Sequence, residues 1–428
     1  MLSSPSHHLL LLAVASAAVS LLCAFLRLPS LVLYGIHTYI HPDSTGADGP
    51  RAVLRRPSAA DLPPEPKRRS RSSSAQNRLP GFDDANAQLL RLRLSDSQLR
   101  SRLFFPSFHT AFLSSAVSLT NLTLLSVLRP SDPSFAVSIA ASAAALTTAH
   151  LFLLLSRIFL ERSASKRSEK ELSFISGILG FVSALVIVFV FSPSLFDIDL
   201  GGDDAGAAKT IASVFAGALA WLLFLPSTRA ARAFWLATDQ LRWNLAVVSC
   251  GSINKSLLYF SVLAGFAAPL LWVSPMAIVL AGGEIRSVGF RKFRVWALLA
   301  SAVLQLMVLR PNIQMYLNEA VICWYQRLHA SRVPDTDYGR AKVFLQNHYL
   351  CLVVLQFLAP PTIVLLLLGL SQVKGDLFSD LLLAGNLLHC SDLVKDVALF
   401  LAWWTMLVSS ILTLSNLALY RCGFLFVS

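Results

Sequence analysis

The chain has 428 residues, of which 55% are hydrophobic and only 14% are charged, and its formal net charge is +12. Soluble domains carry about 25% charged residues and about 45–50% apolar residues, so this composition excludes an ordinary soluble protein and favours lipid as the solvent. The Lys and Arg residues lie mostly in loops beside apolar runs. We therefore assign the positive charge to contacts with membrane lipids rather than with nucleic acid.

Strongly apolar, uncharged runs recur along the chain and predict transmembrane helices. Roughly 20 apolar residues span a bilayer as a helix, because the backbone polar groups must be satisfied within the segment there. The predicted spans are Met1–Leu26, Leu103–Leu128, Ser134–Ser156, Leu172–Ser192, Thr210–Pro226, Ser256–Ala281, Val295–Leu309, Val343–Leu370 and Val397–Tyr420. The predicted fold class is an all-α, polytopic helical membrane bundle of about nine transmembrane helices with interfacial amphipathic helices.

The runs divide the chain into three predicted parts. Residues 1–26 form a first transmembrane helix, 27–102 a basic, largely disordered cytosolic loop with short interfacial segments, and 103–428 an eight-helix transmembrane bundle. The first run lacks the basic n-region of a signal peptide, so we expect a retained helix rather than a cleaved signal.

The loop segment Asp43–Arg78 is rich in Pro, Ser, Gly and Arg and shows no apolar periodicity, which predicts disorder. Its run KRRSRSSSA has two interpretations. It is either a solvated linker near anionic lipid, or a switch in which phosphorylation of the serines at 70–74 cancels the positive charge.

Two spans each contain a pair of prolines, and each proline removes a backbone hydrogen-bond donor. Pro269 and Pro275 predict a kinked or broken helix within Ser256–Ala281. The 28 uncharged residues of Val343–Leu370 would reach about 42 Å as a straight helix, against a hydrocarbon core of about 30 Å. We therefore expect a break in the helix near Leu358–Pro361. We also expect the Gln356 side chain to form a hydrogen bond within the bundle, for example to a backbone carbonyl exposed by the break at Pro269.

Two stretches between spans have amphipathic helical periodicity. In the first, Arg232, Asp239 and Arg242 oppose an apolar stripe flanked by two tryptophans; the stripe is Ala230, Phe234, Ala237, Leu241, Leu245 and Val248. In the second, Asn318 and Glu319 oppose the stripe Ile313, Leu317, Ala320, Trp324 and Leu328. Each is predicted to lie in the cytosolic interface, either packing under the bundle or binding a partner.

The Lys and Arg residues predict the orientation. Assigned to alternate sides of the nine spans, they number 28 against 8. The positive-inside bias places the richer side in the cytosol, with the N-terminus extracytosolic and the C-terminus cytosolic. The four bases of Arg286–Arg294 are the exception, because they fall on the sparsely charged side.

A search for chemistry finds few candidates. The sequence contains no Walker loop, no H-E-x-x-H and no G-x-S-x-G, its six cysteines are scattered, and ionisable residues are almost absent from the spans. Only a meeting of distant histidines, such as His150 and His348, would bring reactive groups together. We expect a protein that is not an enzyme, with no catalytic residue, no metal site and no cofactor.

Several stretches resemble the transmembrane protein 161 family in order and spacing. They are Tyr39-Ile40-His41-Pro42, FLPSTRAAR (224–232), FRVWALLASAVLQLMVLRPNIQMYLNEA (293–320), YLCLVVLQFLAPPTIVLLL (349–367) and FLAWWTMLVSSILTLSNLALY (400–420). The matching motif and polar positions are Tyr39, His41, Pro42, Gln314, Tyr316, Asn318, Gln356, Pro360, Trp403 and Trp404. The resemblance implies a multi-pass membrane protein, and animal members suggest regulation of ion currents and a link to stress tolerance.

The sequence therefore predicts a non-enzymatic membrane regulator or scaffold. Its expected partners are membrane lipids and other membrane proteins, with an unassigned small-molecule or ion ligand. The alternative is a transporter or channel whose site lies at the proline-broken spans 256–281 and 343–370, because discontinuous helices often form substrate sites in transporters. A polar cavity between those two spans would favour the alternative.

Overall fold

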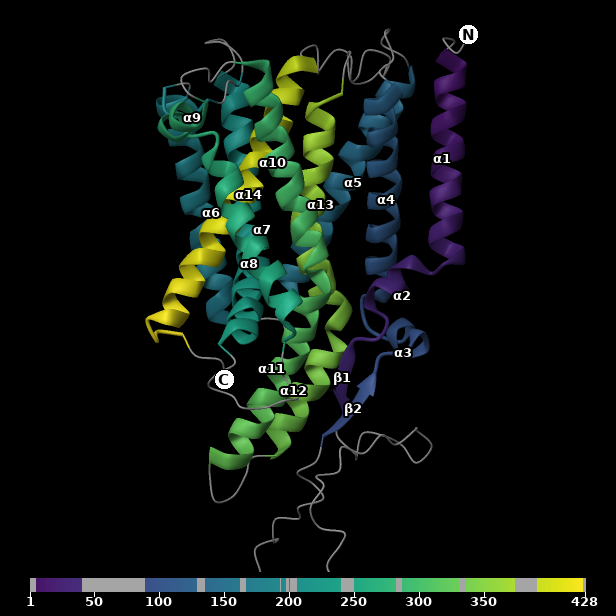
Figure 1. The fold of residues 1–428 in the computed structure, drawn as a ribbon, viewed down its shortest axis with the longest axis vertical. Coiled ribbons are helices and arrows are strands. Elements are labelled where there is room, and N and C mark those ends of the chain that lie inside the picture. Colours follow the sequence, from purple (N-terminus) through teal and green to yellow (C-terminus); the bar gives the residue numbers. More distant parts are fainter. Residues whose placement is uncertain are drawn as a thin grey trace, which may run out of the picture.

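The computed structural model describes most of the chain, in ranges separated by short gaps. The described residues are 5–40, 89–128, 135–161, 167–192, 194–197, 200, 206–239, 250–281, 287–330, 336–373 and 391–425. In these ranges the protein is a bundle of long helices with a two-stranded sheet at one end (Figure 1). The predicted all-α helical membrane bundle is confirmed, with the small sheet as an addition.

Within the described ranges, 8 helices are long and apolar enough to cross a membrane. They are α1 (Pro5–Phe25), α4 (Phe105–Leu128), α5 (Phe135–Leu160), α6 (Arg167–Val186, continued by a π-helical turn at Ile187–Phe191), α7 (Gly206–Thr238), α8 (Ser252–Leu270), α13 (Leu350–Ser371) and α14 (Ser391–Arg421). The count becomes 9 if α10 (Val288–Met307) and α11 (Leu309–Ala330), which bend by 42° at their junction, form one span. The structure therefore agrees with about nine spans.

The shorter elements lie at the two ends of the bundle (Figure 1). They are α2 (Leu28–Leu33), β1 (His37–Ile40), β2 (Leu90–Arg93), α3 (Asp96–Arg100), α9 (Ser274–Ala281) and α12 (Thr336–His348). We call the end that holds β1, β2, α11 and α12 the sheet end, and the end that holds α9 the opposite end. The N-terminal end of α1 lies at the opposite end and the C-terminal end of α14 at the sheet end.

The first helix packs against α4 and α5. One polar pair holds α1 to α4: the Ser16 hydroxyl donates to Asn121 Oδ1 at 3.1 Å, and Asn121 Nδ2 donates back to Ser16 Oγ at 3.0 Å. Such interhelical hydrogen bonds are favoured where lipid offers no competing partner. The pair accounts for Asn121, a polar residue at depth in a predicted span.

Small residues bring α6 and α7 close together. A Cβ added at Gly180 would lie 2.3 Å from the Ala220 Cβ, and one at Gly217 would lie 2.7 Å from the Phe181 Cβ. No side chain fits at either distance, so the two glycines permit the close approach of the backbones. Ala212 and Ala216, four positions apart on α7, are also buried.

Helix α7 differs from its prediction, because it continues beyond Pro226 to Thr238 as one helix of 33 residues. The separate interfacial helix predicted from residue 230 is therefore wrong for residues 230–238, and its remainder, 240–249, lies outside the described residues. The reason is that Arg232, expected to face solvent, finds ion-pair partners on other helices. Pairing removes the need for the polar face to lie in water.

The break predicted in the sixth span is confirmed. Helix α8 ends at Leu270, just after Pro269, and α9 begins at Ser274. The intervening turn is held by the segment after α6, since Asp197 N donates to Trp272 O at 3.1 Å and Ser274 N donates to Leu195 O at 2.8 Å. The carbonyl of Pro269 accepts a hydrogen bond from Trp403 Nε1 at 3.0 Å. The predicted partner for that carbonyl, Gln356, is therefore wrong.

The break predicted at Leu358–Pro361 is also wrong. Helix α13 is continuous from Leu350 to Ser371, through Pro360 and Pro361, and the interruption of the long uncharged run lies at Tyr349, where α12 ends. Nearly every residue of α13 is buried. Neighbouring helices therefore cover the carbonyls that the prolines leave without their usual donors. An α-helix that contains prolines is tolerated in a membrane protein when other helices surround it.

The second amphipathic stretch forms α11, which leaves the bundle as a bent continuation of α10 and pairs with α12 beside β1 and β2 (Figure 1). It packs against α7, α10, α12 and α13, as the packing alternative for this stretch predicted. Four residues of the apolar stripe, Ile313, Leu317, Ala320 and Trp324, are buried as expected. Asn318 and Glu319, predicted to face water, are also buried. Both have polar partners, which are described below.

Strand β1 pairs antiparallel with β2, from His37 opposite Arg93 to Ile40 opposite Leu90. Residues 41–88 connect the strands and lie outside the described residues. The predicted disorder of Asp43–Arg78 and the predicted phosphorylation switch fall within this segment. The described parts of the predicted loop form α2, the two strands and α3. The strands thus hold both ends of the intervening segment at the sheet end of the bundle.

Candidate functional site

Helix α11 is the point at which the motif segments meet. It contacts β1, α7, α10, α12 and α13, and its polar residues lie on two faces because side chains three to four positions apart share a face. Gln314 and Asn318 face β1, whereas Asn312, Tyr316 and Glu319 face the bundle. We describe the β1 side first.

The β1 side is a hydrogen-bond network between family-motif residues. Gln314 pairs with the backbone of His37, accepting from its N–H at 2.9 Å and donating to its carbonyl at 3.1 Å. The Tyr39 hydroxyl donates to Asn318 Oδ1 at 3.0 Å. Asn347 of α12 donates to the Tyr39 carbonyl at 2.5 Å. Burial raises the pKa of Tyr39, so its hydroxyl stays protonated and able to donate.

The bundle side carries a cluster of charges around Arg232 of α7. Its guanidinium lies 3.2 Å from Glu169 of α6 and 3.4 Å from Glu319 of α11, and donates to the Tyr420 hydroxyl of α14 at 3.1 Å. Lys342 of α12 lies 3.6 Å from the same Glu319 carboxylate. We call these five residues the Arg232 cluster. It ties five helices together at the sheet end.

Two aromatic contacts extend the cluster. The guanidinium of Arg229 lies 5.8 Å from the ring centre of Tyr316, within the range of a cation–π contact. Tyr420 stacks on Trp235 at 5.9 Å. Arg229 and Arg232 are the two arginines of the FLPSTRAAR segment, so two of the motif segments are in direct contact here.

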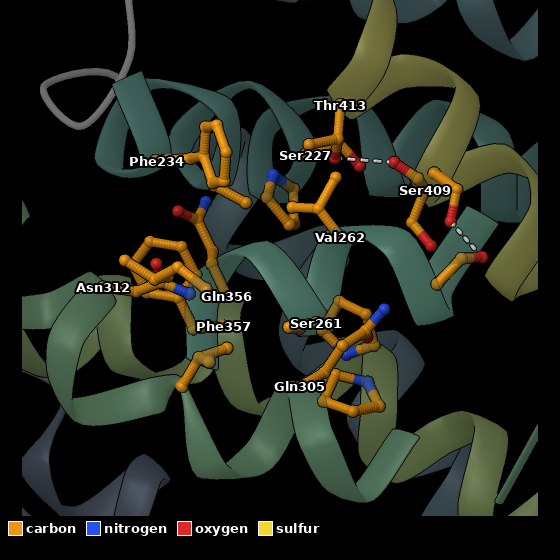
Figure 2. A pocket seen from close by; sticks show the side chains of 18 residues that line it. Ser227, Phe234, Ser261, Val262, Gln305, Asn312, Gln356, Phe357, Ser409 and Thr413 are labelled. Atoms are coloured by element: carbon orange, nitrogen blue, oxygen red, sulfur yellow. Dashed lines mark hydrogen bonds between the residues drawn. The ribbon is translucent and has the colours of Figure 1, made fainter. Parts of the chain in front are cut away.

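A cavity of about 90 Å³ lies beside the cluster, between α7, α8, the junction of α10 and α11, α13 and α14 (Figure 2). By the measure that one water needs about 10–15 Å³, it has room for several. Its polar lining includes Ser261 and Gln305, and its apolar lining includes Phe234 and Phe357. Figure 2 shows Asn312 and Gln356 next to each other on one side of it.

Three oxygen atoms in this cavity are buried without a hydrogen-bond partner among the described residues. They are Ser227 Oγ, Asn312 Oδ1 and Gln356 Oε1. The backbone carbonyls of Gln356 and Phe357 add two further acceptors, because Pro360 and Pro361 have no N–H to donate to the carbonyl four residues earlier. Buried polar groups without partners cost free energy, so the cavity suits water, a cation or a ligand with donor groups.

The structure brings most of the predicted positions into the β1 network, the Arg232 cluster and the cavity. Tyr39, Gln314 and Asn318 share the network on β1, Tyr316 lies at the Arg232 cluster, and Gln356 and Pro360 line the cavity. Trp403 and Trp404 are structural donors on α14, to the carbonyls of Pro269 at 3.0 Å and Ala216 at 2.9 Å. His41 and Pro42 lie outside the described residues.

Sequence reasoning missed Ser227, Asn312, and the Arg232 pairs with Glu169 and Glu319. One signal was available for Asn312 and Glu319: the run from Asn312 to Glu319 places polar residues all around a helix that also carries an apolar stripe. Such a helix needs polar partners on more than one side. The ion pairs with Arg232 join residues 63 and 87 positions apart, and local spacing does not reveal them.

A family model described as "Predicted transmembrane protein 161AB" matches residues 204–384. Over these residues the chain is similar to the transmembrane protein 161 family. The match begins at α7 and includes α11 and α13, so it contains Arg232, Glu319 and the cavity residues from Ser227 to Gln356. The resemblance predicted from the sequence is confirmed. No solved structure matches the chain.

Among the described residues, His348 stacks on Phe344 at 5.7 Å and meets Tyr349 at 5.1 Å. No group of three or more His, Cys, Asp or Glu side chains in the described ranges is placed to hold a metal ion. The chemistry that the site does offer is hydrogen bonding and ion pairing between helices.

Proposed function

We propose that this protein is a non-enzymatic regulator or scaffold within the membrane, whose segment between β1 and β2 acts on the bundle through α11. The observation that supports the proposal is the position of α11. It holds β1 with Gln314 and Asn318, pairs with Arg232 through Glu319, and reaches the cavity with Asn312. A shift of β1 would therefore move α11 and change both the ion pairs of the Arg232 cluster and the lining of the cavity.

The charge distribution supports an orientation for this regulator. The described Lys and Arg residues of the richer set belong to the segments that meet at the sheet end, where α14 finishes. By the positive-inside bias this end faces the cytosol. The N-terminus is then extracytosolic and the C-terminus cytosolic, so the segment 41–88 is accessible to cytosolic partners and to anionic lipid.

The regulator is tested by recording whole-cell currents in cells that express the full chain. We expect the wild type to change the amplitude of endogenous ion currents, and the double variant Gln314→Leu/Asn318→Leu at equal membrane abundance to leave them unchanged. The control is Asn416→Leu, because Asn416 bonds only to its own helix at Leu412 and should act as the wild type does. Equal currents with and without the wild-type chain would contradict the proposal.

A transporter or channel is the second candidate, favoured by the cavity. Helices α8 and α13 both line this cavity, α8 with Ser261 and α13 with Gln356. A polar cavity between these two spans is the feature expected to favour a transporter or channel. The purified chain in liposomes separates the candidates. A regulator gives no flux of K⁺, Na⁺ or Cl⁻ above protein-free vesicles. A channel gives flux that Gln356→Leu alters while the protein stays folded, and such flux would replace the first proposal.

A further inference from the structure

A second pocket, of about 480 Å³, lies at the opposite end of the bundle, away from the Arg232 cluster. Its walls include the turn between α8 and α9 at Trp272, the start of α10, the end of α13 at Gln372, and α14 at Phe400 and Trp403. Three bases of α10, which are Arg291, Lys292 and Arg294, line it, together with two acids, Asp197 and Asp396. Its size is that of a small-molecule site.

Arg294 is the unusual member, because its side chain is only 1% exposed. Its guanidinium is held between two aromatic rings, 4.6 Å from the ring centre of Phe290 and 5.3 Å from that of Trp272. Nη1 donates to Asp197 Oδ2 at 2.6 Å. Nε and Nη2 have no hydrogen-bond partner among the described residues.

The two unused nitrogens form one edge of the guanidinium. Nε–H and one N–H of Nη2 point the same way in the guanidinium plane, and this is the fork that binds two oxygens of a carboxylate or a phosphate group. Asp197 occupies only the Nη1 side. Trp272 also lines the pocket, and its Nε1 is a third buried donor without a partner in the described part of the chain.

The rim adds positive potential. Arg291 and Lys292 are exposed beside the buried arginine, one turn or less from it on α10. With two acids against three bases, the described lining keeps an excess of one positive charge. These bases also belong to Arg286–Arg294, the exception to the charge asymmetry of the sequence. A functional use of the bases explains why they are present at the sparsely charged end.

We propose that this pocket binds an oxyanion, with the Nε/Nη2 edge of Arg294 as a bidentate donor, Trp272 Nε1 as a third donor, and Arg291 and Lys292 as charged groups at the rim. The ligand group is a phosphate or carboxylate that carries at least two acceptor oxygens. Because the pocket lies at an end of the membrane bundle, the group belongs either to a phospholipid headgroup or to a soluble anion.

The first test measures the unfolding midpoint of the purified full chain in detergent, titrated with inorganic phosphate or with acetate against sodium chloride of equal ionic strength. Parallel titrations use dioctanoyl phosphatidic acid and dioctanoylglycerol, its phosphate-free counterpart. Stabilisation by inorganic phosphate or acetate assigns a soluble anion. Stabilisation by phosphatidic acid alone assigns a lipid headgroup. The absence of any response beyond the chloride and dioctanoylglycerol controls overturns the proposal.

The second test uses variants. Arg294→Lys keeps the charge but loses the fork, so the active probe should bind at least about tenfold more weakly. If that variant does not fold, Arg291→Ala/Lys292→Ala is informative, because both side chains are exposed and their loss should weaken binding without unfolding the protein. Lys209→Ala, at the same end but outside the pocket lining, is the matched control. An unchanged affinity in both pocket variants would show that the anion binds elsewhere.

Discussion

Two arginines of this protein are largely buried at opposite ends of the bundle, and they differ in the number of hydrogen-bond partners around their guanidinium groups. Arg232, with a quarter of its side chain exposed, has two carboxylates and a tyrosine hydroxyl around it. Arg294, almost fully buried, has one carboxylate and two aromatic rings. The more deeply buried group thus has the fewer hydrogen-bond partners. Pairing of the first kind holds helices together, whereas the second kind leaves donors for a ligand.

The largest effect is expected from Arg232→Met. It removes the base that lies 3.2 Å from Glu169 and one of the bases that contact Glu319, and breaking a buried ion pair costs about 3–5 kcal/mol. The measurement is the free energy of unfolding in mixed micelles. Glu171→Gln is the control, because its pair with Arg167 is highly exposed and should contribute little.

Arg294→Met sharpens the comparison, because it should cost less than Arg232→Met. Only one charged hydrogen bond is lost, worth about 1.5–3 kcal/mol, and Asp197 is a third exposed and able to hydrate. The same unfolding assay measures the cost. If Arg294→Met proved the more destabilising change, the arginine would be a structural lock like Arg232, and its unused edge would not be available to a ligand.

A smaller effect, of about 1 kcal/mol, is expected for Tyr39→Phe, which removes the hydrogen bond to Asn318. Its use lies in double variants. Combined with Glu319→Gln, at the residue that follows Asn318 on α11, its effect should be non-additive, because neighbours in one network couple. Combined with Arg294→Met at the far end, the two effects should add. Additivity in both pairs would mean that α11 does not link β1 to the Arg232 cluster.

The smallest effect concerns pH at the sheet end. Burial, with Arg91 and Arg93 nearby, lowers the pKa of His37 below its usual 6.5. The unfolded state therefore binds the proton more readily, so this residue's contribution to stability is present above the unfolded-state pKa and is lost as the pH falls below it. The loss of stability between pH 7 and pH 5 should be smaller in His37→Gln than in the wild type. An equal loss in both proteins would contradict this assignment.

The sequence predicted the spans and the break at Pro269 well, because both follow from local composition: apolar length fixes the span, and a proline removes a donor wherever it lies. It failed at Pro360 and Pro361 because tolerance of a proline depends on what covers the freed carbonyls, and that is decided by helices distant in sequence. It also misjudged Arg232 and Glu319, since a charged face predicts solvent unless the opposite charge arrives from elsewhere. The motif residues Tyr39, Gln314 and Asn318 were identified, but their mutual contact was not.

The polar pair between Ser16 and Asn121 has a consequence for biosynthesis. Helix α1 leaves the ribosome before its partner α4, which begins at Phe105, and at about 5–20 residues per second the delay is on the order of ten seconds. During that interval Ser16 has no polar partner from α4 in the lipid. The hydrogen bonds with Asn121 form only once α4 is inserted, so the earlier helix is held by a contact that later synthesis supplies.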